Sequence, residues 1–142
     1  MIGEKMDSEM TSEIIDKKCM EVLLKSQQGE LDAVPMYNAL AKVVRDEKDS
    51  ATFKQLSAEE GHHASIFKNL TKNDSLKPKK TKAVLVPLLY RIIGKKKLYR
   101  IIAQQEYDAE KKYEPVVEKF PQVESVKNDE HRHGDMVLGL LK

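Results

Sequence analysis

The chain has 142 residues, of which 34% are charged and 40% hydrophobic, with a net charge of +2 and one cysteine. This length predicts a single domain over residues 1–142, long enough to bury a core. The near balance of charge gives no chain-wide attraction for nucleic acid, so we expect no nucleic-acid partner. A lone cysteine excludes an internal disulfide framework and a four-cysteine metal site. Few aromatic residues and few glycines favour an all-α protein over a β-sandwich.

The N-terminal residues do not have the pattern of a secretion signal. Residues 1–10 lack both a basic start and an apolar centre, so we expect a flexible tail and a cytoplasmic protein. The most apolar stretch, residues 83–94, falls well short of the roughly 20 residues that a membrane span needs. We therefore expect no transmembrane helix.

The first two helices are predicted to form an antiparallel hairpin. Apolar residues recur at helical spacing over residues 11–46, with Ser12 placed to cap the start. A second helix is predicted to begin at Asp49 or Ser50 and to end at the sequence TKNDS (71–75). Only a few residues separate these helices, which favours antiparallel packing.

The second half of the chain predicts another hairpin. Helical periodicity covers residues 95–119 and 123–141, with a break at Pro121. Residues 71–94 are too long for a tight turn, so we expect a crossover along a four-helix bundle, with a short helix over 84–93.

The apolar stripes of the second and fourth helices are interrupted by charge. With alternate steps of three and four residues, the stripes read Phe53, Leu56, Glu60, His63, Phe67, Leu70 and Val123, Val126, Glu130, His133, Val137, Leu140. Each stripe places a Glu, and a His three residues later, where a core side chain is expected. The adjacent Glu59 and His62 fall off the stripe and are predicted to lie at the surface, although His62 is a candidate proton relay.

The first and third helices share a different pattern. Each stripe contains a Glu followed seven residues later by a Tyr: Glu30 and Tyr37, then Glu106 and Tyr113. The two halves of the chain therefore each contribute two Glu, one His and one Tyr to the predicted core.

Burial of these groups needs compensation. Unpaired ions in a protein core cost several kcal/mol each, which a domain of this size cannot absorb. Two metal ions would compensate, each held by a His and a Glu, with the remaining glutamates bridging them. Imidazole and carboxylate donors favour iron or manganese over calcium or magnesium, and the absence of thiolates argues against structural zinc. A single Glu-x-x-His is usually solvated surface, but two such pairs inside apolar stripes favour a dimetal site.

Four stretches resemble the rubrerythrin branch of the ferritin-like superfamily. They are GELDAVPMYNALAKV (29–43), LSAEEGHHASIF (56–67), QQEYDAEKKYEPV (104–116) and VKNDEHRHGDMV (126–137). The resemblance extends over about residues 15–140 and is nearest to the type that occurs alone or fused to membrane iron-transporter domains, often called membrane-bound ferritin. It implies a ferritin-like four-helix bundle that binds two iron ions, with manganese or zinc as substitutes.

The resemblance also implies roles for particular residues. The implied metal ligands are Glu30, Glu60, His63, Glu106, Glu130 and His133. Tyr37 and Tyr113 look like phenols that hydrogen-bond ligand carboxylates, with core filling as the alternative. Typical rubrerythrins have a further Glu three residues beyond the third-helix ligand, where this chain has Ala109. Glu110, one residue later, is the alternative seventh carboxylate.

Three functional hypotheses remain open from the sequence. The resemblance implies a di-iron oxidoreductase that reduces peroxide or oxidises iron(II). Rubrerythrins proper carry a four-cysteine rubredoxin module, so this chain would need an external redox donor protein. The missing module and Ala109 favour the alternative of iron binding, storage or sensing without multiple turnovers. A metal-free structural bundle is disfavoured by the cost of burying the charges.

The crossover carries a separate signal. Residues 71–97 contain nine Lys or Arg against one Asp, so this segment has a charge of +8 while the rest of the chain has −6. The favoured interpretation is a solvated basic rim whose apolar side packs on the bundle or on a second subunit, and we expect a homodimer. Contact with an anionic membrane surface, a redox partner or a nucleic acid is the less favoured alternative.

Overall fold

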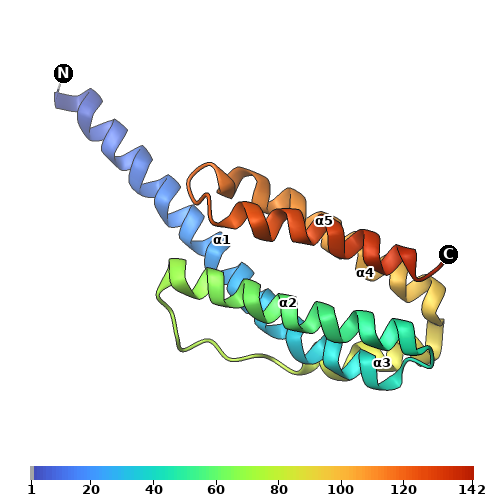
Figure 1. Cartoon of the computed structure of the whole chain (residues 1–142). Helices are drawn as coiled ribbons and strands as arrows, with labels where there is room; N and C mark the ends of the chain where they lie inside the picture. The colour runs from blue at the N-terminus through green and yellow to red at the C-terminus, as the bar shows by residue number, and fades with distance from the viewer. Residues whose placement is uncertain (1) are drawn as a thin grey trace.

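Within the described residues, the computed structural model has five helices arranged as two antiparallel hairpins and a crossover (Figure 1). It describes the backbone of residues 2–142 and their side chains except those of residues 2–7, 9–12 and 15. The helices are α1 (Ile2–Val43), α2 (Glu47–Thr71), α3 (Thr81–Ile93), α4 (Lys95–Val117) and α5 (Val123–Gly139). α1 pairs with α2 and α4 pairs with α5, as in a ferritin-like bundle. The predicted all-α fold is confirmed.

The first helix is longer than predicted. α1 begins at Ile2 rather than near Thr11, so residues 2–10 continue the helix, and their flexibility stays a prediction. Ser12 therefore lies inside α1 and does not cap its start, and its side chain is outside the described residues.

The second helix begins earlier than predicted because another residue caps it. α2 starts at Glu47, and the Asp46 carboxylate accepts hydrogen bonds from the backbone N–H groups of Lys48 and Asp49 at 2.8 and 3.2 Å. Asp49, which we predicted as a cap, is buried instead. Its Oδ2 accepts hydrogen bonds from the Tyr99 hydroxyl at 2.7 Å and from Lys95 Nζ at 3.1 Å.

Polar side chains of α1 hold the crossover against the bundle. The buried Gln27 donates to the backbone carbonyl of Asn73 at 2.7 Å and accepts from the Thr71 hydroxyl at 2.5 Å. Asp32 accepts from the backbone N–H of Lys79 at 2.7 Å. Beyond these contacts the chain enters α3, which packs on α1. Among the described helices, none is both long enough and apolar enough to cross a membrane.

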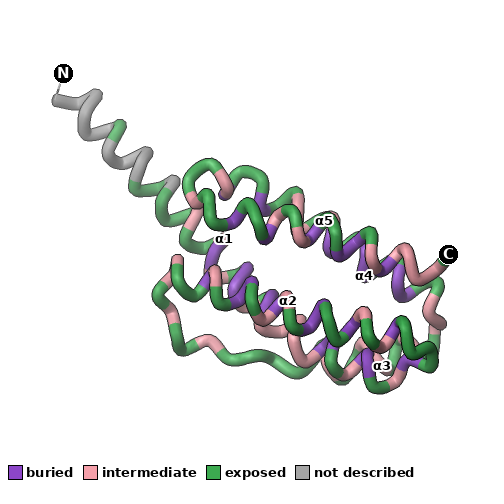
Figure 2. Tube along the Cα trace, in the orientation of Figure 1, coloured by how far each residue is buried: buried purple, intermediate pink, exposed green. Residues whose placement is uncertain are grey.

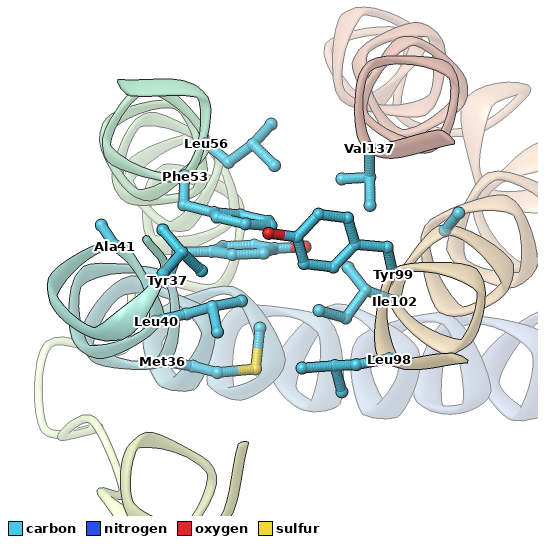
Figure 3. Packing of buried hydrophobic residues seen from close by; sticks show 12 residues of the cluster. Met36, Tyr37, Leu40, Ala41, Phe53, Leu56, Leu98, Tyr99, Ile102 and Val137 are labelled. Atoms are coloured by element: carbon cyan, nitrogen blue, oxygen red, sulfur yellow. The ribbon is translucent and has the colours of Figure 1, made fainter. Parts of the chain in front are cut away.

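Buried apolar side chains form two clusters, and Figure 2 shows the buried positions on the inward faces of the hairpins. In the first cluster, side chains from α1, α2, α4 and α5 meet, and the ring of Phe53 lies between those of Tyr37 and Tyr99, with centroids 5.9 and 5.2 Å away (Figure 3). The second cluster consists of Leu23, Phe67, Tyr113, Val116, Val123 and Val126. Along each helix, the charged stripe positions fall between the residues of these two clusters.

α4 and α5 approach closely at Gly134. A Cβ atom added there would lie 2.5 Å from the Tyr107 ring. The Tyr107 hydroxyl donates to Asp135 Oδ1 at 2.5 Å, which fixes the ring over the glycine. A residue without a side chain at this position therefore allows the two helices of the second hairpin to pack beside His133.

We predict that Gly134→Ala lowers the free energy of unfolding by about 1–3 kcal/mol, because the Tyr107 ring must move and release Asp135. Gly29→Ala is the matched control, since nothing lies within 4 Å of its added Cβ. That substitution should raise stability by about 0.5–1 kcal/mol, as alanine is the better helix former. Urea unfolding followed by circular dichroism measures both. Equal stabilities would contradict the close approach.

Candidate metal centre

Helices of both hairpins bring six charged side chains to one buried point. They are Glu30 from α1, Glu60 and His63 from α2, Glu106 from α4, and Glu130 and His133 from α5. Their exposed fractions lie between 0 and 6%. Each occupies a stripe position that apolar residues fill one turn away, so the helical period alone directs it inward.

The six side chains divide into two overlapping groups. Glu30, Glu60, His63 and Glu130 form one, and Glu60, Glu106, Glu130 and His133 form the other. Within each group the donor atoms all lie within 4.8 Å of one another. Because Glu60 and Glu130 belong to both, they are placed to bridge two metal ions, while Glu30 and Glu106 each belong to one group.

The Nδ1 atoms of both histidines face the carboxylates. His63 Nδ1 lies 3.1 Å from Glu130 Oε1 and 3.5 Å from both Glu30 Oε2 and Glu60 Oε1. His133 Nδ1 lies 2.9 Å from Glu60 Oε1 and 3.7 Å from Glu106 Oε2 and Glu130 Oε1. The two imidazole rings lie 5.5 Å apart and nearly parallel.

The buried atoms of this cluster are short of hydrogen bonds. Among the described side chains, five buried polar atoms have no hydrogen-bond partner, and all five belong to the cluster: Glu30 Oε2, Glu60 Oε1, His63 Nδ1, Glu130 Oε1 and His133 Nδ1. The short nitrogen–oxygen distances given above lack hydrogen-bond geometry. An unsatisfied buried polar atom costs about 1–3 kcal/mol. Unpaired imidazole nitrogens facing unpaired carboxylate oxygens are the donor set of a dimetal site, so these residues fit two metal ions.

The outer nitrogens of both histidines are held by carboxylates that the sequence stripes did not single out. His63 Nε2 lies 2.8 Å from Asp129 Oδ2, and His133 Nε2 lies 3.3 Å from Glu59 Oε1. Asp129 immediately precedes Glu130 and Glu59 immediately precedes Glu60, the two glutamates shared by both groups, and each contacts the His of the other hairpin. Such contacts orient a metal-binding imidazole and make it a stronger donor.

Arg132 links these two outer carboxylates. Its guanidinium donates to Asp129 Oδ1 at 3.0 Å and also to Glu59. Partial burial, the largest single influence, raises the pKa of Glu59, but the contacts with Arg132, Gln55 and His133 together outweigh it and lower that pKa to about 2. The pKa of Asp129 is also lowered, since contacts with His63 and Arg132 outweigh burial. The prediction that Glu59 is only a surface neighbour was therefore wrong. The signal available in the sequence was an acidic residue before the Glu of both Glu-x-x-His motifs.

Two tyrosines hold Glu30 and Glu106, the two glutamates that each belong to one group only. The Tyr37 hydroxyl donates to Glu106 Oε1, and the Tyr113 hydroxyl donates to Glu30 Oε1 at 3.0 Å. Each tyrosine thus contacts a Glu from the opposite hairpin. Burial first, and nearby carboxylates second, raise the pKa of both phenols well above the ordinary value. Both phenols therefore stay protonated and act as donors.

The remaining predicted residues lie outside the two groups. The Glu110 carboxylate lies 2.8 Å from His131 Nδ1 at the exposed edge of α4 and α5, so the structure does not place it as a seventh carboxylate. Ala109 faces a cavity of about 170 Å³ that also reaches the four clustered glutamates, Tyr37 and Tyr113. His62 is exposed, as predicted.

The close packing of four carboxyl groups and two imidazoles determines which groups of the cluster hold protons. Burial, followed by the charges of the other glutamates, raises the pKa of Glu60, and burial together with those charges raises that of Glu130 to about 11. Burial opposes the charged form of His63 and His133, but the surrounding carboxylates outweigh it and raise both pKa values. Glu30 has a lowered pKa because contacts with Glu60, His63 and Tyr113 outweigh its burial.

The fold and this donor set define a helical bundle with a site suited to two metal ions. The sequence matches the Rubrerythrin family over residues 21–141, and the chain belongs to that family. Comparisons with curated proteins and with solved structures gave no significant match. The family match confirms the rubrerythrin resemblance and does not test the resemblance to proteins fused to membrane transporters.

We predict that metal-free protein, prepared with a chelator, loses stability as the pH rises from about 5 to about 8, by on the order of 1 kcal/mol per pH unit. Between the ordinary carboxyl pKa of 4.5 and the raised value of about 11, folded protein holds a proton on Glu130 that the unfolded chain releases. Rising pH therefore favours unfolding. The raised pKa values of His63 and His133 act in the same direction above 6.5.

Thermal unfolding at several pH values measures this dependence. Glu130→Gln, which cannot ionise, should weaken the pH dependence, whereas the exposed Glu124→Gln should not. Added metal should reverse the trend, because metal ions and protons compete for the same atoms. Stability that rises with pH in the metal-free protein would contradict the assignment of these pKa directions.

Proposed function

We propose that this protein is a non-haem di-iron protein that reduces peroxide with electrons from an external redox donor. The observation that carries the proposal is a pair of donor groups sharing Glu60 and Glu130 beside a cavity large enough to admit peroxide. Imidazole and carboxylate donors suit iron, and the family is consistent with that metal. When bound, two iron(II) ions would supply the two electrons that convert one hydrogen peroxide and two protons into two waters.

The protein side chains would fix the geometry of such a site. Tyr37 donates to Glu106 and Tyr113 donates to Glu30, each across to the opposite hairpin. These hydrogen bonds would hold both glutamates in place while the charge of the metal site changes. Asp129 and Glu59 fix the imidazoles from the outside, and their contacts with Arg132 and the histidines lower the pKa of both carboxyl groups. Pre-oriented ligands need little rearrangement during reaction.

The cavity favours a small neutral substrate. Its volume of about 170 Å³ corresponds to a few water molecules at roughly 30 Å³ each. Exposed lysines also line it, namely Lys25, Lys82 and Lys112. Their ammonium groups repel an iron(II) cation more than a neutral peroxide, which favours peroxide reduction over iron(II) oxidation. Partial burial, followed by the neighbouring Lys25, lowers the pKa of Lys112.

Iron storage or sensing is the second candidate function. Two observations favour it: Ala109 stands where typical rubrerythrins have a carboxylate, and one cysteine cannot build a four-cysteine electron-transfer centre. In this alternative, occupancy of the site would matter more than turnover.

Stopped-flow absorption of anaerobic iron(II)-loaded protein mixed with hydrogen peroxide tests the proposal. We expect rapid oxidation with one peroxide consumed for two iron ions, repeated when a reductant is supplied. Ala109→Leu should fill the cavity and keep the metal stoichiometry. It should slow oxidation at least about tenfold, since the larger side chain blocks the approach of peroxide to the metal ions. The exposed Ala58→Leu is the matched control and should react like the wild type.

Two results would contradict peroxide reduction. Oxidation that occurs once and leaves iron that no reductant recycles would support storage or sensing. An unchanged rate in Ala109→Leu, with two metal ions still bound, would show that peroxide does not use this cavity.

A further inference from the structure

α3 exposes an apolar face that the bundle does not use. Its outer face consists of Val84, Leu85, Leu88, Leu89 and Ile92, which are 68, 50, 50, 40 and 69% exposed. At the helical rotation of about 100° per residue, these five positions span about 140° of the helix surface, so they form one continuous face. Contiguous exposed apolar surface of this kind marks an interaction site.

The opposite side of α3 provides its attachment to the bundle. Val86, Tyr90 and Ile93 are partly buried and pack against the first core cluster. The outer face is therefore not a misplaced core face. Substitutions on the outer face therefore do not remove the contacts by which α3 packs on the bundle.

Cationic side chains flank this face, and the surrounding sequence contains no acidic residue. Residues 75–105 contain no Asp or Glu, and their basic residues are Lys77, Lys79, Lys80, Lys82, Arg91, Lys95, Lys96, Lys97 and Arg100. Eight of them are exposed, while the partly buried Lys95 pairs with Asp49 at 3.1 Å. Of these eight, four precede or begin α3, Arg91 lies in its last turn and three follow its end, so positive charge lies at both ends of the outer face.

A surface hollow at the C-terminal end of α3 has the same sign of charge. It has a volume of about 480 Å³ and is lined by Arg45, Arg91 and Lys95 together with Tyr90. Guanidinium and ammonium groups around one hollow suit a phosphate group.

These features distinguish between possible occupants of the outer face. A second copy related by two-fold symmetry would bring two sets of the same cations together, which is unfavourable. Nucleic acid would satisfy the cations but leave the aliphatic side chains exposed. A bilayer containing anionic phospholipids satisfies both, because acyl chains cover the aliphatic face while headgroup phosphates meet the cations.

We propose that α3 and its flanking cations form a membrane-surface anchor that inserts Leu85, Leu88 and their neighbours at the boundary between the headgroups and the acyl chains of an anionic bilayer. With 13 residues, α3 is shorter than the roughly 20 residues of a membrane span and lies in the plane of the interface. The anchor would place the candidate metal centre next to lipid, independently of which reaction that centre performs.

Sedimentation of the full chain with lipid vesicles tests the anchor. We expect binding to vesicles of phosphatidylcholine with about one third phosphatidylglycerol, little binding to phosphatidylcholine alone, and weaker binding at high salt. Leu85→Ser/Leu88→Ser and Lys79→Gln/Lys80→Gln/Lys96→Gln should each weaken partitioning at least about tenfold. Circular dichroism of each variant verifies that the bundle is folded.

Matched controls separate the anchor from general stickiness. Ile14→Ser/Met20→Ser removes exposed apolar side chains from α1, and Lys17→Gln/Lys18→Gln/Lys54→Gln removes exposed charge elsewhere. Both should bind like the wild type. Absence of binding to anionic vesicles, or equal loss in test and control variants, would overturn the proposal. Light scattering that shows a dimer which Leu85→Ser/Leu88→Ser dissociates would also overturn it, because a second copy would then cover this face.

Discussion

The burial of four carboxyl groups and two imidazoles in one core is the constraint on which the rest of the structure depends. The two apolar clusters supply the hydrophobic stabilisation of the bundle, but the charged layer between them leaves five polar atoms without partners. Without metal, shared protons and raised histidine pKa values must balance the charge. With two metal ions, the same atoms become ligands and this destabilising layer becomes a stabilising one.

The two hairpins support each other's side chains through contacts that cross the bundle. Tyr37 of the first hairpin holds Glu106 of the second, and Tyr113 of the second holds Glu30 of the first. In the same way, Asp129 of the second hairpin contacts His63 of the first, and Glu59 of the first hairpin contacts His133 of the second. Metal binding and hairpin packing are therefore coupled, because four of the six clustered residues are oriented by the hairpin to which they do not belong: Glu30, Glu106, His63 and His133.

The sequence predicted the fold class and the six clustered residues because helical periodicity determines which side chains face inward. Glu60 and His63 could be separated from Glu59 and His62 on that basis alone. Periodicity says nothing of contacts between hairpins, so the contact of Glu59 with His133 and the position of Glu110 beside His131 could not be predicted. Asp46 was missed as the cap of α2 because Asp49 is an equally good capping residue by type. The contacts of Asp49 with Tyr99 and Lys95, which explain its burial, cannot be read from the sequence.

The central claim is that Glu60 and Glu130 are shared by two metal ions. Anomalous X-ray diffraction at the iron absorption edge, from crystals grown with iron(II), tests it most directly. We expect two anomalous peaks per chain, both in contact with Glu60 and Glu130, one beside His63 and the other beside His133. A single peak, or peaks outside the cluster of Glu30, Glu60, His63, Glu106, Glu130 and His133, would contradict it.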